Sequence, residues 1–138
     1  MKDFNQNQIG ISFKGIGSYV PMQILSNEKV SQIVDTSDEW IRTRTGISNR
    51  RIAGINENVS EMGYKASIAA LEMAKWSPES IDLIILASST PSDLFGSAPS
   101  IQAKLKAKNA VAFDLTAACS GFIFALITAS QYLKLGNY

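Results

Sequence analysis

The sequence predicts a layered α/β fold, because apolar runs alternate with helical segments along its second half. Residues 81–87 form one continuous apolar run, and residues 110–115 form another. Apolar runs without polar alternation are typical of strands that helices cover on both faces. A helix expected from about Ser97 or Pro99 to Ala107 separates the two runs. They should therefore form a strand–helix–strand unit with parallel strands.

Composition narrows the class of protein. The chain has 138 residues, 46% hydrophobic and 18% charged, which suits one folded domain rather than a disordered segment. Its formal net charge of +1 gives no general attraction to nucleic acid. We also expect no membrane span, because no apolar run approaches the ~18 residues that one requires. The polar residues 1–8 lack the apolar core of a secretion signal.

The counts of cysteine and histidine restrict the chemistry further. Cys119 is the single cysteine, so an internal disulfide is impossible and we expect a reducing, cytoplasmic setting. The chain has no histidine, which excludes a Cys–His or Ser–His pair within it. These counts also argue against a metal site.

Residues 9–17 alternate apolar with small or polar residues, which predicts a strand. The segment Gly15-Ile16-Gly17 begins like a dinucleotide-binding fingerprint, but the third glycine is missing and Pro21 interrupts. The alternative is a strand that ends in a turn.

Three helices are expected in the first half. Ser26 can cap a short helix that reaches Val34. Residues 36–39, Thr-Ser-Asp-Glu, are typical of a capping box, and the helix that follows should run to about Thr45 and end at Gly46. A third helix is expected from Ser60 to about Lys75.

Trp40 and four arginines gather in and just after the second of these helices. The arginines are Arg42, Arg44, Arg50 and Arg51. Arginine side chains pair with phosphate oxygens, and a tryptophan face can stack on a purine. Together they could hold a ligand that carries a nucleotide. The alternative is a solvated basic face with Trp40 in the core.

Cys119 lies between the second apolar run and a long apolar segment, at the expected amino end of a helix that continues to about Leu135. A helix amino end stabilises a thiolate, and its free amides can hold a developing oxyanion. The small residues around Cys119 leave room for a substrate carbonyl. The pattern indicates acyl transfer through a thioester. The alternative is a cysteine that packs as a small hydrophobic residue.

The helix after Cys119 is apolar nearly all round, with Phe122, Ile123, Phe124, Leu126 and Ile127 among its residues. Such a helix belongs inside a protein rather than on its surface. The few strands and helices expected here cannot easily enclose it. We therefore expect residues 1–138 to be a fragment of a larger layered protein.

Several long segments resemble one known family. They are residues 15–21, 34–41, 43–47 and 112–122, and the similarity runs from about Ile9 to the last residue. The family is β-ketoacyl-[acyl-carrier-protein] synthase III, the initiating condensing enzyme of type II fatty acid synthesis. The resemblance implies a thiolase-like layered α/β fold, of which residues 1–138 are the amino-terminal part. It also implies a homodimer.

The resemblance implies an activity and roles for five residues. Members condense acetyl-CoA or another short acyl-CoA with malonyl-ACP, and they need no cofactor. By the family pattern Cys119 is the nucleophile, and Trp40 stacks on the CoA adenine. Thr36 and Arg44 match positions near the CoA nucleotide. Phe95 matches the residue that reaches across the dimer and limits the acyl pocket of the partner.

The sequence departs from the family in one important respect. The catalytic histidine and asparagine of the family lie in its second half, and neither position is present here. The resemblance therefore implies an acyltransferase whose condensation step these residues cannot complete. Two other hypotheses remain: a non-catalytic chain that binds only CoA or a partner subunit, and a thiol redox protein. The redox hypothesis lacks a second cysteine to resolve an oxidised thiol.

Overall fold

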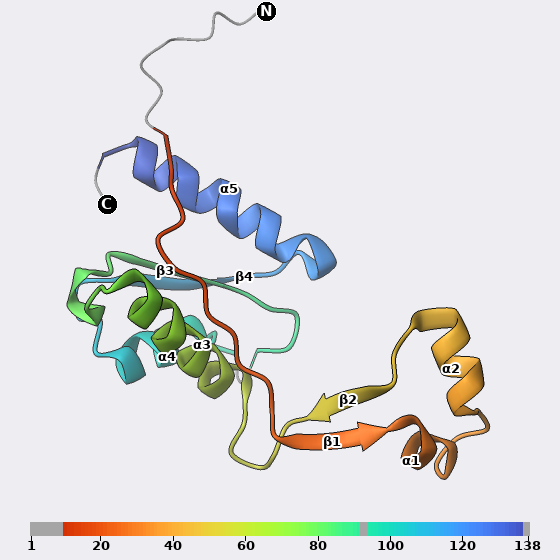
Figure 1. Ribbon diagram of the computed structural model, residues 1–138. Coiled ribbons are helices and arrows are strands. Elements are labelled where there is room, and N and C mark those ends of the chain that lie inside the picture. The colour runs from red at the N-terminus through yellow and green to blue at the C-terminus, as the bar shows by residue number, and fades with distance from the viewer. Residues whose placement is uncertain (1–9, 92–93, 137–138) are drawn as a thin grey trace, which may run out of the picture.

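A computed structural model describes residues 10–91 and 94–136 of the chain. It contains a layered α/β body and an arm that extends away from it (Figure 1). At the centre of the body, β3 (Leu83–Ala87) and β4 (Val111–Leu115) pair in parallel, with Leu83 opposite Val111 and Ala87 opposite Leu115. The predicted strand–helix–strand unit is confirmed, because α4 (Ala98–Leu105) connects the two strands.

Helices cover both faces of this sheet. The helices α3 (Val59–Ala74) and α4 lie on one face, and α5 (Gly121–Lys134) lies on the other (Figure 1). The buried core lies on the α3 and α4 side and comprises Leu71, Ile101, Leu105, Ala107 and Ala110. All five residues of β3 are only partly buried. The sheet is therefore covered above and below, although its strands are not fully enclosed.

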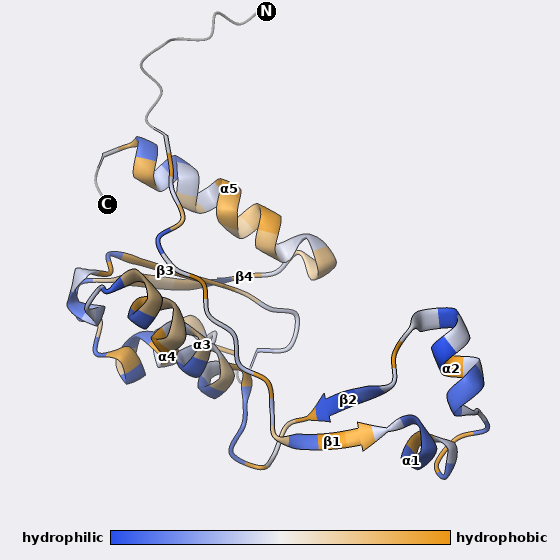
Figure 2. Cartoon of the chain, viewed as in Figure 1, coloured by the Kyte–Doolittle hydropathy of each residue, from blue (hydrophilic) through white to orange (hydrophobic). Residues whose placement is uncertain are grey.

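The helix α5 carries an exposed apolar surface. Its exposed large hydrophobic residues are Phe122, Ile123, Phe124, Ile127 and Leu133. The apolar colouring of this helix is plain in Figure 2. The sequence predicted that this helix belongs inside a protein. The described residues cover it only in part. Apolar faces of this extent usually mark a surface that another part of a protein covers.

The arm is built on an antiparallel ribbon of β1 (Gln23–Ser26) and β2 (Asn49–Ile52), with Gln23 opposite Ile52. Two helices connect the strands, α1 (Asn27–Ser31) and α2 (Asp38–Thr45). Gly46 ends α2 in the left-handed conformation, as predicted. The amino-terminal cap is Ser37 rather than Thr36, and Ser37 accepts a hydrogen bond from Trp40 N. The predicted capping box is therefore wrong, because the third helical position holds Trp40 and not the Glu or Gln that a capping box needs.

The predicted strand at residues 9–17 is wrong for residues 10–17, which have no strand pairing. This segment passes over α3 instead. A Cβ atom on Gly15 would collide with the Ala70 carbonyl oxygen, and one on Gly17 would collide with that of Ala66. The two glycines thus allow a close backbone approach to a helix. The structure provides a packing reason for Gly-Ile-Gly that requires no nucleotide.

Candidate active site

Cys119 lies in a tight turn between β4 and α5, within the 3-10 turn Ala118–Ser120, and it is exposed. The turn begins where the carboxyl ends of β3 and β4 meet. Ser88 N donates to the Leu115 carbonyl at 3.1 Å, and Thr116 Oγ1 donates to the Ser88 carbonyl at 2.9 Å. These two hydrogen bonds fix the strand ends from which the thiol turn departs. Open α/β sheets commonly place ligand sites at this edge.

The backbone of the turn has an unusual conformation. Ala118, directly before the cysteine, has φ of +46°. The left-handed conformation costs a residue with a Cβ roughly 1–2 kcal/mol. Two residues after the cysteine, the Cβ position of Gly121 lies only 3.0 Å from Ala87 Cβ. The amino end of α5 is thus pressed against β3, and a strained residue turns the chain so that Cys119 faces outward.

The amino end of α5 directly follows the thiol, and the amides of Ser120 and Gly121 donate to the carbonyls of Ala117 and Ala118. Its cap residue, Ser120, makes no side-chain capping hydrogen bond in the described structure. An oxygen that gains negative charge next to Cys119 would meet the positive end of the helix dipole. The arrangement suits the oxyanion that forms on a carbonyl oxygen when the sulfur attacks the carbonyl carbon.

An apolar cavity of about 550 Å³ lies beside this turn. It runs between α5 and β3, and Ala118, Gly121 and Phe122 line its end nearest the cysteine. Ile85 and Leu126 belong to its apolar walls. Space of this character next to a nucleophile suits a hydrocarbon substituent better than a charged one.

On the arm, Trp40 and Arg44 form a stacked pair one helical turn apart on α2. The Arg44 guanidinium carbon lies 4.5 Å from the centroid of the Trp40 ring. The Trp40 side chain is not in the core, since 52% of the residue is exposed. Cation–π contacts at exposed sites contribute about 0.5–1 kcal/mol. The pair therefore presents a planar surface and a positive charge to solvent.

The other three arginines have structural partners. Arg42 forms an ion pair with Asp38 at 3.2 Å. Arg50 Nη1 donates to Asn27 Oδ1 at 2.9 Å, and Arg51 Nη1 donates to the Pro21 carbonyl at 3.0 Å. The predicted cluster of four arginines is thus divided, and Arg44 is the member that accompanies Trp40. Thr36 is partly buried directly before the Ser37 cap.

Phe95 lies in the turn between β3 and α4, and 91% of it is exposed. The next residue, Gly96, has φ of +88° and leads into α4. The Asp114 carboxylate on β4 accepts hydrogen bonds from Ser97 N, at 2.9 and 2.8 Å, and from Ala98 N at 2.6 Å. Phe95 and the Cys119 turn therefore both follow the carboxyl ends of the two paired strands.

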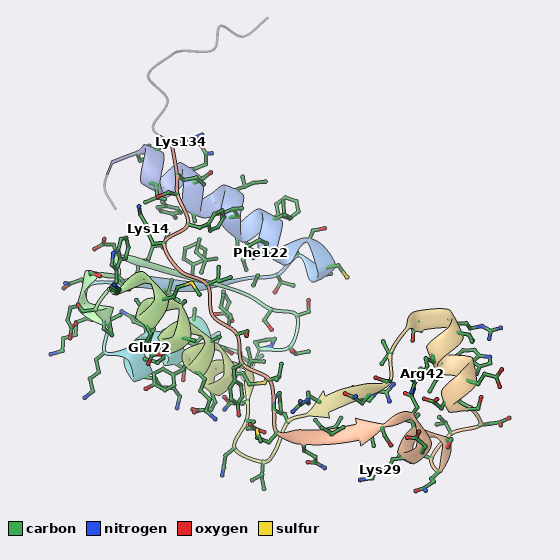
Figure 3. The ribbon with its side chains drawn as sticks, in the orientation of Figure 1. Lys14, Lys29, Arg42, Glu72, Phe122 and Lys134 are labelled. Atoms are coloured by element: carbon green, nitrogen blue, oxygen red, sulfur yellow. The ribbon has the colours of Figure 1, made fainter. Side chains whose placement is uncertain are left out.

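The structure does not bring all the predicted site residues together. The helix α2 and the amino end of α5 lie well apart (Figure 1). The same separation is visible between the labelled residues Arg42 on α2 and Phe122 on α5 (Figure 3). Trp40 and Arg44 thus form one group, while Cys119 belongs to another. A ligand that touched both would have to be long.

Two structurally central side chains were missed by the sequence analysis. Asp114 caps α4, and its signal was a lone acidic residue in an apolar run. Asn27 is fully buried and joins three parts of the arm. Its amide donates to Asp38 Oδ1 at 2.8 Å and to the Ile47 carbonyl at 2.7 Å, and its oxygen accepts from Arg50. The Asn27 amide, followed by Arg42, holds the pKa of Asp38 below its ordinary value.

A third polar cluster ties the amino-terminal segment to α3. The Tyr19 hydroxyl donates to Glu57 Oε1 and accepts from Lys65 Nζ at 3.1 Å. The Tyr19 hydrogen bond is the main cause that lowers the pKa of Glu57, with a further contribution from Gly54 N. The same hydroxyl is the main cause that raises the pKa of Lys65.

Over residues 10–91 and 94–136, no three or more His, Cys, Asp or Glu side chains are grouped as metal ligands would be. Among those same residues, no helix has both the length and the apolar character needed to cross a membrane.

Comparison with known proteins connects this geometry to one family. The family model for 3-oxoacyl-[acyl-carrier-protein] synthase III matches residues 113–138, from the middle of β4 through α5, and so includes Cys119. A β-ketoacyl-[acyl-carrier-protein] synthase III from Prochlorococcus marinus (strain MIT 9515) is 73% identical over all 138 residues. The chain is a relative of β-ketoacyl-[acyl-carrier-protein] synthase III. The resemblance noted in the sequence is confirmed.

Solved structures agree with the sequence comparison. The 3-oxoacyl-[acyl-carrier-protein] synthase III of Aquifex aeolicus VF5 is 51% identical with a TM-score of 0.88, over 92% of this chain and 41% of that chain. The priming β-ketosynthase of the R1128 polyketide pathway is 41% identical with a TM-score of 0.85, over 88% and 37%. These structures confirm that the chain has a thiolase-like α/β fold and forms only part of it. The chain spans about two fifths of the length of the Prochlorococcus relative, 41%.

Proposed function

We propose that this chain is the acyl-accepting part of a β-ketoacyl-[acyl-carrier-protein] synthase III that starts type II fatty acid synthesis. The observation that carries the proposal is the position of Cys119. The cysteine is exposed at the β4–α5 turn, inside the segment that the family model matches. The reaction class is acyl transfer from acetyl-CoA or another short acyl-CoA, without a cofactor.

The first step is a thioester exchange. The Cys119 sulfur, as thiolate, attacks the carbonyl carbon of the acyl-CoA, and a tetrahedral oxyanion forms. The positive end of the α5 dipole stabilises that oxyanion. The bond from the carbonyl carbon to the CoA sulfur then breaks. The acyl group remains on Cys119, and the proton that the cysteine thiol lost is recovered by the departing CoA thiolate.

Trp40 and Arg44 are proposed to bind the nucleotide end of CoA, with Thr36 beside them. Coenzyme A carries its adenine and its thioester at opposite ends, so a bound molecule can contact two separated groups of residues. The exposed Trp40 ring supports stacking, and Arg44 supports pairing with phosphate. The separation of α2 from the Cys119 turn is therefore compatible with one extended ligand.

Phe95 is proposed to limit the acyl pocket of a second protomer in a homodimer. Its exposure on a turn suits a residue that reaches a partner. We place the enzyme in the cytoplasm, as the single cysteine led us to expect.

Condensation with malonyl-ACP requires groups that these 138 residues do not contain. The chain has no histidine. By the resemblance, a histidine and an asparagine promote decarboxylation of the malonyl group and stabilise the resulting carbanion. This absence favours a second candidate for the 138 residues alone, a chain that binds CoA or a partner subunit without completing catalysis.

The test uses a chimera that joins residues 1–138 to the remaining part of the Prochlorococcus MIT 9515 relative. The chimera and the 138-residue chain are each incubated with acetyl-CoA and malonyl-ACP, and β-ketoacyl-ACP is measured by mass spectrometry. We expect product from the chimera and none from the 138 residues. A folded chimera that forms no product, while the intact relative does, would contradict the proposal.

A further inference from the structure

Asp114 connects the two loops that leave the carboxyl edge of the sheet. Its carboxylate accepts three short contacts from the backbone amides of Ser97 and Ala98, between 2.6 and 2.9 Å. Five residues further along the chain lies Cys119, and two residues before Ser97 lies Phe95. One side chain on β4 therefore fixes the start of α4 next to the proposed acyl-pocket residue.

Gly96 makes this connection tight. It occupies the left-handed region with φ of +88°, which suits glycine. A Cβ atom at this position would lie 2.9 Å from Asp114 Oδ1, too close for an undisturbed carboxylate. The turn therefore curls around the carboxylate and leaves little freedom where Phe95 joins α4. Ser97 and Ala98 are both fully buried, so their amides have little access to water.

The residues that follow Asp114 in the chain are also held in place. Its neighbour Leu115 accepts a hydrogen bond from Ser88 N, and Thr116 Oγ1 donates to the Ser88 carbonyl. The strand position that carries the carboxylate is thus fixed relative to the turn that carries Cys119. The strand β4, which leads to the thiol, therefore also holds the turn at Phe95 in place, because its Asp114 binds the amides that follow Phe95.

We propose that Asp114 is a positioning residue that fixes the turn carrying Phe95, and thereby the boundary that Phe95 sets for the acyl pocket of the partner protomer and the length of acyl chain accepted there. The inference rests on the proposed function. Loss of the carboxylate frees the Ser97 and Ala98 amides and loosens the turn, so the pocket boundary formed by Phe95 becomes less defined. Acceptance of chains longer than acetyl then rises relative to acetyl.

The test has two readouts. In the 138-residue chain, hydrogen exchange is followed in a peptide that contains residues 95–98. In the chimera, kcat/KM is measured with acetyl-CoA and butyryl-CoA. Asp114→Asn replaces one acceptor oxygen with an NH₂ group that faces backbone donors, so exchange should quicken. The butyryl-to-acetyl ratio should rise by roughly tenfold, the scale at which a pocket discriminates by a methylene.

A second variant and a control separate positioning from general damage. Gly96→Ala keeps the carboxylate but crowds it, and it should shift the ratio in the same direction. Glu72→Gln changes an exposed acid near the end of α3, outside the lining of the cavity beside Cys119, and should alter neither readout. Thermal unfolding identifies a variant that has lost its fold.

The possible failures are distinguishable. A parent chimera that acetyl-CoA does not acylate would contradict the proposed function. Unchanged exchange at residues 95–98 in Asp114→Asn would overturn the positioning role by itself. An unchanged butyryl-to-acetyl ratio in both folded variants would also overturn it.

Discussion

The Arg44 guanidinium lies over the Trp40 ring, 4.5 Å from its centroid, on the exposed side of α2. Residues four apart on a helix are neighbours, so the helix itself brings the two side chains together. The contact holds the indole outward with one face against a cation. The opposite face remains the natural place for a planar base.

The first prediction is that Trp40→Ala weakens CoA binding. Base–aromatic stacking is worth about 1–3 kcal/mol, so the dissociation constant should rise roughly fivefold or more in calorimetry with the chimera. Trp76→Ala is the matched control, because Trp76 is 50% exposed and lies away from α2, in the loop between α3 and the η1 turn (Pro78–Ser80). Equal affinities for the parent and Trp40→Ala would remove Trp40 from the proposed CoA site.

The second prediction concerns pH. The Tyr19 hydrogen bond lowers the pKa of Glu57 in the folded protein. The interaction therefore stabilises the fold above the pKa of Glu57 in the unfolded chain, near 4.5, and this stabilisation is lost as pH falls through the folded pKa. Tyr19 raises the pKa of Lys65, so that effect is present below 10.5 and is lost as pH rises through the folded value. Tyr19→Phe should therefore flatten both the acid and the alkaline loss of stability.

Urea unfolding of the chimera across a pH series measures this effect. Tyr64→Phe serves as the control. Tyr64 packs against the core and is not among the groups that shift the pKa of Glu57 or Lys65. Some acid dependence should persist in Tyr19→Phe, since Asn27 lowers the pKa of Asp38 independently. Parallel pH curves for the parent and Tyr19→Phe would show that the Tyr19 hydroxyl does not govern these groups.

The third prediction is that Ala118→Gly stabilises the protein but slows acylation. Glycine removes the cost of the left-handed conformation, roughly 1–2 kcal/mol for a residue with a Cβ atom. Glycine also loses more conformational entropy on folding, which offsets roughly 0.5–1 kcal/mol of that gain. A gain in the free energy of unfolding of up to about 1 kcal/mol is expected by that difference. The freer turn should hold Cys119 less firmly, so the rate of transfer from acetyl-CoA should fall.

Lys75→Gly is the control for this strain. Lys75 also has positive φ, +56°, at the end of α3 and away from the thiol turn. It should show a similar gain in stability with an unchanged acylation rate. If Ala118→Gly matched Lys75→Gly in both properties, the strain at Ala118 would have no part in catalysis.

The fourth prediction is that the 138-residue chain self-associates. Phe122 and Ile123 expose 66% and 54% of their surfaces on α5, within a larger apolar face. We expect concentration-dependent association in sedimentation and binding of an apolar dye, both reduced in the chimera. A sharp, reversible unfolding transition of a monomeric 138-residue chain would show that this surface needs no cover.

Local signals predicted much of this architecture. The helix at 38–45 could be predicted because a serine precedes it, two acidic residues form its start, and Gly46 ends it. The parallel pair of β3 and β4 followed from two apolar runs joined by a helix. These features depend on residues close in sequence, or on a short crossover that leaves few topologies.

Features that depend on distant partners could not be predicted. The β1–β2 ribbon was missed because Arg50 and Arg51 make β2 polar, and its partner lies more than twenty residues away. Residues 10–17 have a strand pattern but pair with no strand, and Gly15 and Gly17 approach the backbone of α3. The role of Asp114 depends on amides of another loop, so a lone acid in an apolar run was its single sign.

The central claim is that Cys119 accepts the acyl group from CoA. The measurement is intact-mass and peptide analysis of the chimera after incubation with acetyl-CoA in the absence of malonyl-ACP, with the Prochlorococcus relative as positive control. The account predicts one acetyl group per chain, located on Cys119 and absent from Cys119→Ser. A folded chimera whose Cys119 stays unmodified while the relative is acetylated would contradict it.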